Sequence, residues 1–123
     1  MAFPIPGTPR LIAPSFVGPY YAKEAPRPVT VEELQVIIRQ FGEAALRVKK
    51  AGADGVEIHA AHAHGLLGGF LSPLYNKRTD AYGGDINGRL KLTLEVIAEV
   101  RKICGKDSSS MYVFPEMNIQ TGV

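Results

Sequence analysis

The sequence contains two amphipathic segments, each followed by a short run of strand-forming residues. Residues 31–51 carry apolar side chains at three- and four-residue steps, a period that predicts a helix with one buried face. Thr30 and Glu33 have the spacing of a capping box, and Gly52 stands where a left-handed helix end is expected. Residues 89–104 repeat the helical period. The chain is therefore expected to contain two helices, each with one buried face.

The segments that follow these helices are expected to be strands. Residues 54–60 contain β-branched residues after the helix-ending glycine, and residues 111–114 are a short apolar run before Pro115. Between them, residues 61–88 form a long loop with an apolar patch near Leu66 that is expected to make one helical turn. This alternation of helices and strands along the chain implies parallel strands that are connected by crossover helices. The fold class is therefore α/β, as a doubly wound sheet or a (β/α) barrel.

Both ends of the chain are expected to be irregular. Residues 1–29 contain seven prolines. Because proline lacks an amide donor and restricts the residue before it, these residues are expected to form an extended arm without regular structure. Residues 115–123 are expected to be an irregular tail, which leaves residues 30–114 as the folded domain.

Composition excludes several classes of function. Lysine and arginine number 14 against 12 aspartates and glutamates, and no cationic run exceeds two residues, so a nucleic-acid partner is not expected. Apolar runs are far shorter than the roughly 20 residues that cross a bilayer, and no signal-peptide pattern is present, so no membrane association is expected. The single cysteine, Cys104, fits the reducing cytoplasm and excludes a thiolate metal cluster in this stretch.

All three histidines, His59, His62 and His64, lie within six residues at the carboxyl end of the strand that is expected at residues 54–60. In parallel α/β proteins the loops at this end form the ligand-binding face. An imidazole there can donate a hydrogen bond to a carbonyl oxygen and stabilise negative charge on it. His59 and His62 can share one oxygen if the chain turns immediately after His59, whereas a continuing strand would direct them to opposite faces.

Two other interpretations of the histidine cluster are open. The histidines can satisfy buried backbone groups, or they can bind a metal ion, since imidazole is the commonest zinc ligand. Metal binding would make the protein a metal-dependent barrel hydrolase or lyase. The spacing His59-x-x-His62-x-His64 is not the helical i, i+4 pair of a metalloprotease, and we assign no metal ligand.

The stretch after the cluster carries a more specific pattern. Residues 71–89 read LSPLYNKRTDAYGGDINGR, and residues 51–59 read AGADGVEIH. Together with the helix at 31–51, they resemble the Old Yellow Enzyme family of FMN-dependent ene-reductases. The resemblance is to the branch of NADH:flavin oxidoreductases that includes 2-enoate and dienoyl-CoA reductases, and it covers residues 27–105.

The resemblance implies an eight-stranded (β/α) barrel, a TIM barrel, with FMN at the carboxyl ends of its strands. NADH or NADPH then supplies hydride to the flavin, which reduces the activated C=C bond of a small unsaturated carbonyl substrate. The polar residues at the positions of His59 and His62 bind the substrate carbonyl. In the loop 76–84, a pair formed by Arg78 and Asp80 is expected to hold a glycine-rich turn rather than to act in catalysis.

Two departures from the family pattern stand out. Many members carry a tyrosine shortly after the second histidine that delivers the proton, whereas this chain has none there. His64 is the nearest substitute, and the pKa range of histidine suits general acid catalysis. The family also usually carries an arginine on the strand after the second helix, yet residues 111–118 contain none. The resemblance is therefore expected to stop near Lys106.

The length limits how much of a barrel is present. A (β/α) barrel needs about 250 residues, and the chain has 123, so about two βα units from the middle of a partial barrel are expected. Such a piece leaves strand edges and an apolar sheet face uncovered, which favours self-association. A cofactor-free, inactive fragment is therefore a third interpretation.

Overall fold

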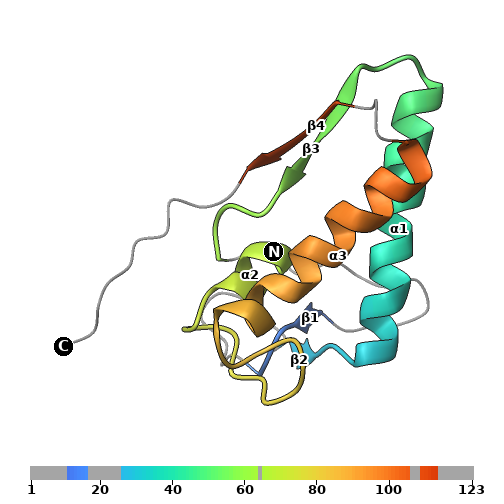
Figure 1. Ribbon diagram of the computed structural model, residues 1–123. Coiled ribbons are helices and arrows are strands. Elements are labelled where there is room, and N and C mark those ends of the chain that lie inside the picture. Colours follow the sequence, from blue (N-terminus) through green and yellow to red (C-terminus); the bar gives the residue numbers. More distant parts are fainter. Residues whose placement is uncertain (1–10, 17–25, 64, 106–108, 114–123) are drawn as a thin grey trace.

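The computed structural model describes residues 11–16, 26–63 and 65–105, together with the backbone of 109–113. Two very short strands are followed by a long helix, a strand, a short helix, a second long helix and a last strand. In chain order these elements are β1 (Ile12–Ala13), β2 (Arg27–Pro28), α1 (Val31–Lys50), β3 (Gly55–His59), α2 (Leu66–Leu71), α3 (Ile86–Cys104) and β4 (Ser109–Val113). Figure 1 shows α1 and α3 packed side by side, with the β3–β4 pair beside them.

The β3–β4 pair gives the chain its α/β character. The two strands are parallel, and their register runs from Gly55 opposite Ser109 to His59 opposite Val113. They are joined through α3, which is the crossover helix that parallel strands require. The expected parallel strands are therefore confirmed, with boundaries that differ from the predicted 54–60 and 111–114 by one or two residues.

The proline-rich arm is more regular than predicted. β1 and β2 form a second parallel pair inside residues 1–29, where no regular structure was expected. The amide of Arg27 donates to the carbonyl of Leu11 at 2.9 Å, and that of Val29 donates to Ala13 at 2.9 Å. Since only alternate amides face the partner strand, the missing amide of Pro28 falls where no donor is needed. For residues 12–13 and 27–28 the prediction was wrong, because it rested on the number of prolines and not on which amides donate to the partner strand.

The start of α1 confirms the predicted capping box. The hydroxyl of Thr30 accepts from the Glu33 amide at 3.2 Å, and a Glu33 carboxylate oxygen accepts from the Thr30 amide at 2.9 Å. Arg27 adds two hydrogen bonds to the same carboxylate, at 2.8 and 2.5 Å. The residue that caps the helix therefore also ties it to β2.

This arrangement predicts an acid-sensitive contribution to stability. The hydrogen bonds from Arg27, and then the one from the Thr30 amide, lower the pKa of Glu33 from 4.5 to about 2. Because the pKa is lower in the folded chain, the stabilisation is fully present above about pH 4.5 and is lost as the pH falls through about 2. We expect Glu33→Gln to lower the free energy of unfolding by about 1 kcal/mol at pH 7.

Urea unfolding at pH 7 and at pH 3 checks this prediction. The difference between wild type and Glu33→Gln is expected to be less than half as large at pH 3, because the unfolded carboxyl is then already mostly protonated. A difference of equal size at both pH values would contradict the assigned role of the ionised carboxylate.

The second long helix begins earlier than predicted. Its first residue is Ile86 rather than residue 89, and the Asp85 side chain caps it by accepting from the Gly88 amide at 2.9 Å. Asn87 and Gly88 are poor helix formers, and because of this low helix propensity the first turn of α3 was not predicted from the sequence. The cap outweighs that propensity.

The core lies between α1, α3 and the elements they cover. Phe70 of α2, Leu34 of α1 and Leu92 of α3 are fully buried. A Cβ at Gly42 of α1 would lie 2.6 Å from the end of the Ile103 side chain, so the two long helices approach closely there. The helical turn expected near Leu66 is confirmed as α2. None of the helices in the described part of the chain is both long and apolar enough to cross a membrane.

Candidate active site

The candidate site is formed by the end of β3 and the turn that follows it. His59 is the last residue of β3, and the backbone of His62 is left-handed, with φ of 64°. The strand therefore ends at His59 and the chain turns at His62, so strand alternation does not direct the two rings to opposite faces. The imidazole rings of His59 and His62 lie with their centroids 5.6 Å apart and their planes at 50°. Both residues are exposed.

The left-handed backbone of His62 is a costly conformation for a residue with a side chain. It disfavours the folded state by roughly 1 kcal/mol and persists only where surrounding contacts impose it. One such contact is the hydrogen bond from the Gly65 amide to the His62 carbonyl, at 3.0 Å. Such backbone strain is concentrated at functional sites. This strained turn therefore makes His62 a candidate functional residue.

His64, the third residue of the predicted cluster, lies outside the described residues. Among those that are described, no three histidine, cysteine, aspartate or glutamate side chains come together as a metal cluster would require. The exposed pair of imidazoles has the donor chemistry for the carbonyl oxygen of an acceptor molecule. We assign no flavin contact to any described residue.

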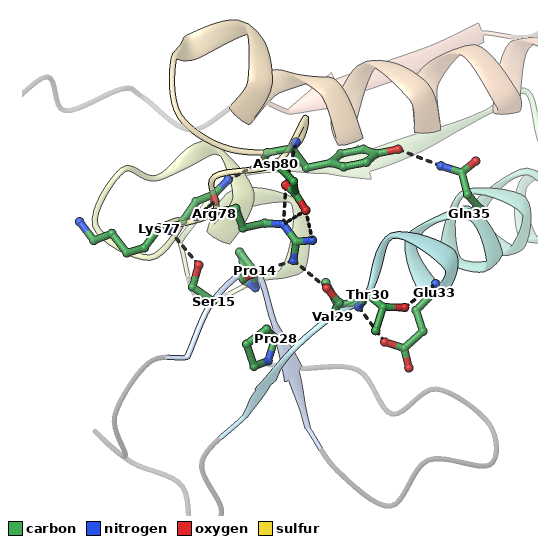
Figure 2. A network of polar contacts seen from close by, with 12 residues as sticks. Pro14, Ser15, Pro28, Val29, Thr30, Glu33, Gln35, Lys77, Arg78 and Asp80 are labelled. Carbon is green, nitrogen blue, oxygen red and sulfur yellow. Dashed lines mark hydrogen bonds and ion pairs between the residues drawn. The ribbon is translucent and has the colours of Figure 1, made fainter.

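Arg78 connects the loop after α2 to both short strands, as Figure 2 shows. Its Nη1 donates to the carbonyl of Pro14 at 3.0 Å and to that of Val29 at 2.6 Å. Its Nη2 pairs with the Asp80 carboxylate at 2.5 Å. The predicted pair of Arg78 and Asp80 is therefore confirmed as structural, and its reach to β1 and β2 was not predicted.

Asn76 fixes the same loop from inside. It is buried, and its amide donates to the carbonyls of Phe70 and Tyr82, each at 2.8 Å. Its side-chain oxygen accepts from the Arg78 amide at 3.1 Å. The Lys77 amide donates to the Ser15 hydroxyl at 2.8 Å, which adds a second link to the region of β1 (Figure 2). The loop that follows the histidine turn is therefore held on several sides.

Tyr82 joins the two long helices. Its hydroxyl donates to the Glu95 carboxylate of α3 at 2.8 Å and accepts from the Gln35 side chain of α1 at 2.8 Å. Burial, and then the hydrogen bond and charge of Glu95, raise the pKa of Tyr82 to about 12. The side chain of Arg89 donates to the carbonyls of Leu71 and Gly84 and so holds the start of α3 to the preceding loop.

Tyr82→Phe is expected to lower the free energy of unfolding by about 1 kcal/mol, since it removes a hydroxyl with two partners. The contribution is fully present below about pH 10 and is lost as the pH rises through 12, because the folded chain holds the neutral phenol. Ultraviolet titration should show one of the five tyrosines ionising near pH 12, and this component should be absent from Tyr82→Phe. An unchanged titration curve would contradict the assignment.

Comparison with known proteins identifies the family to which this chain belongs. Residues 13–122 match the model of the NADH:flavin oxidoreductase / NADH oxidase family. The chain therefore belongs to this family. The match extends on both sides of the expected 27–105, so the prediction that similarity stops near Lys106 was wrong. The absence of arginine from 111–118 misled it, because one missing residue does not end a homologous segment.

The chain is similar to two named reductases and a dehydrogenase. It is 48% identical over 81 residues to a cinnamate reductase of Clostridium sporogenes, covering 66% of this chain and 12% of the relative. It is 46% identical over 93 residues to an NADPH dehydrogenase of Halalkalibacterium halodurans, covering 76% of this chain and 27% of the relative. The structure of morphinone reductase matches with a TM-score of 0.78 and 30% identity, covering 87% of this chain and 32% of that one.

These matches bear on the alternatives left open by the sequence. They confirm the α/β class as part of a (β/α) barrel and agree with FMN and a nicotinamide reductant as the cofactors of the family. They favour flavin chemistry over a metal-dependent hydrolase or lyase. The chain spans only 12% and 27% of the length of the two curated relatives.

Proposed function

We propose that this chain is the central part of an FMN-dependent oxidoreductase that reduces the activated C=C bond of an enone or enoate with NADH or NADPH. One observation carries the proposal. In a chain of this family, two exposed imidazoles lie 5.6 Å apart where β3 ends and the backbone turns. The names cinnamate reductase and enoate reductase among the relatives support an unsaturated carbonyl as the substrate class.

In this proposal, His59 and His62 both donate hydrogen bonds to the carbonyl oxygen of the substrate. Bound FMN supplies the hydride. As the hydride reaches the β-carbon, negative charge develops on the carbonyl oxygen, and the two imidazoles stabilise it there. We propose His64 as the donor of the proton that completes the reduction at the α-carbon, since it follows His62 by two residues in the sequence.

The experiment uses the whole protein that contains this segment. Its flavin is reduced anaerobically with NADH or with NADPH, and an enone or its saturated ketone analogue is then added. We expect the protein to contain bound FMN and at least one of the two nicotinamides to reduce it. The enone should then reoxidise the reduced flavin, whereas the saturated ketone should not. A protein without flavin, or a reduced flavin that no enone or enoate reoxidises, would contradict the proposal.

We also propose that the protein acts in the cytoplasm and that the isolated 123-residue chain associates with itself. In the described part of the chain, β3 and β4 pair only with each other, and Leu74 and Phe16 are 76% and 68% exposed. Open strand edges and exposed apolar side chains both favour association. Sedimentation velocity of the isolated chain should show dimers or larger species, and a monomer at all concentrations would contradict this.

A further inference from the structure

We propose that Gly68 is a positioning residue for the histidine pair, and this inference rests on the proposed function. Gly68 lies buried in α2, directly against the turn that carries His62. A Cβ at this position would overlap the carbonyl oxygen of His62 and would lie 2.8 Å from its carbonyl carbon. It would also lie 3.0 Å from the carbonyl oxygen of Ala60. Only glycine allows α2 to pack at this distance.

The contact falls on the part of the backbone that directs the His62 ring. The backbone of His62 is left-handed, and the His62 ring lies beside the ring of His59. A methyl group at Gly68 has to displace either α2 or the His62 peptide. Because the neighbouring atoms are backbone, no side-chain rotation relieves the overlap.

The position of the ring matters because a shared oxygen accepts two hydrogen bonds only within a narrow range of distances. Donor and acceptor atoms have to approach to about 3 Å, and a site displaced by about 1 Å loses much of its effect. Gly68 therefore acts through His62 and does not touch the substrate.

Gly65 provides the matched control. It lies in the same connection between His62 and α2, yet a Cβ there would meet the His62 carbonyl oxygen at an ordinary 3.6 Å. Alanine at position 65 keeps the amide that donates to this carbonyl. Gly65→Ala and Gly68→Ala thus add the same methyl group, which fits without a clash at position 65 and overlaps the His62 carbonyl at position 68.

The first measurement detects the ring contact in this chain. With only three histidines in the sequence, selective labelling of histidine resolves each imidazole by NMR. We expect a nuclear Overhauser effect between the His59 and His62 rings in wild type and Gly65→Ala, and its loss in Gly68→Ala. Retention of the ring contact in a folded Gly68→Ala chain would overturn the inference.

The second measurement uses the whole flavoprotein. Gly68→Ala is expected to raise the dissociation constant of an enone about tenfold, with an unchanged rate of flavin reduction by the nicotinamide. Equal losses in both half-reactions would overturn the inference, since they indicate a general structural defect. Lost ring contact with unchanged enone affinity would uphold the positioning role and overturn the proposed role of the histidine pair.

Substitutions at position 62 test the same turn if Gly68→Ala does not fold. Asparagine adopts a left-handed backbone readily, whereas valine does so at a high cost. We expect hydrogen exchange of the α2 amides to stay near the wild-type rate in His62→Asn and to rise at least tenfold in His62→Val. Equal exchange in the two variants would overturn the inference, because the left-handed turn would then not support α2.

Discussion

Arg78→Ala is expected to lower the free energy of unfolding by about 4 kcal/mol, the largest effect on stability that we predict for a single side chain. The side chain of Arg78 is only 10% exposed and donates to the carbonyls of Pro14 and Val29, the residues that directly follow β1 and β2. Hydrogen bonds from a charged donor contribute about 1.5 to 3 kcal/mol each. The pair with Asp80 adds little, because Asp80 is 38% exposed.

Urea unfolding measures this effect, and the neighbouring lysine serves as its control. Lys77 also donates to a backbone carbonyl, that of Pro73, but does so at the surface. Lys77→Ala is therefore expected to change stability by less than about 0.5 kcal/mol. Arg78→Lys should recover only part of the loss, because an ammonium group cannot reproduce the planar set of guanidinium donors. Similar losses in Arg78→Ala and Lys77→Ala would contradict the account of this loop.

Local sequence signals predict the helices well because their causes are local. The apolar period of α1 and the pair of Thr30 and Glu33 lie within the helix or next to it. The strand at Gly55–His59 was predicted from residues in the strand and from the glycine before it. In each case the signals that start or end the element are local, although the pairing of β3 with β4 joins residues that lie far apart in the chain.

The β1–β2 pair and the role of Arg78 were missed because their causes lie far apart in the sequence. Arg78 reaches carbonyls 64 and 49 residues away, at Pro14 and Val29. Because every residue carries a backbone carbonyl, the sequence does not indicate which carbonyl accepts a hydrogen bond from Arg78. The pattern of Asn76, Arg78 and Asp80 indicated a family, and only the coordinates show that these side chains hold the loop to the strands.

The arrangement of His59 and His62 was predicted in part, whereas their function stays a prediction. The three imidazoles at a strand end are evident in the sequence, and the alternation of side chains along a strand predicts that the rings of His59 and His62 meet only if the strand ends between them. The left-handed backbone at His62 could not be predicted, because positive φ is uncommon for a residue other than glycine. In the structure this turn packs against α2, where a Cβ at Gly68 would overlap the carbonyl oxygen of His62.

Loss of either imidazole is expected to slow the reduction of an enone by about 100-fold in the whole protein. Removing one hydrogen-bond donor from a developing oxyanion typically lowers the rate by about 10² to 10³. His62→Asn is expected to retain more of the rate than His62→Ala, because asparagine keeps an N–H donor and tolerates the left-handed backbone. The two alanine substitutions are not expected to be additive, since both donors act on one oxygen.

The most direct test of the central claim is the rate at which an enone reoxidises the reduced flavin, measured anaerobically by stopped flow in the whole protein. The claim predicts that His59→Ala and His62→Ala each slow this step by about 100-fold and leave flavin reduction by the nicotinamide at the wild-type rate. Wild-type reoxidation rates in both variants would show that the two imidazoles do not bind the carbonyl group.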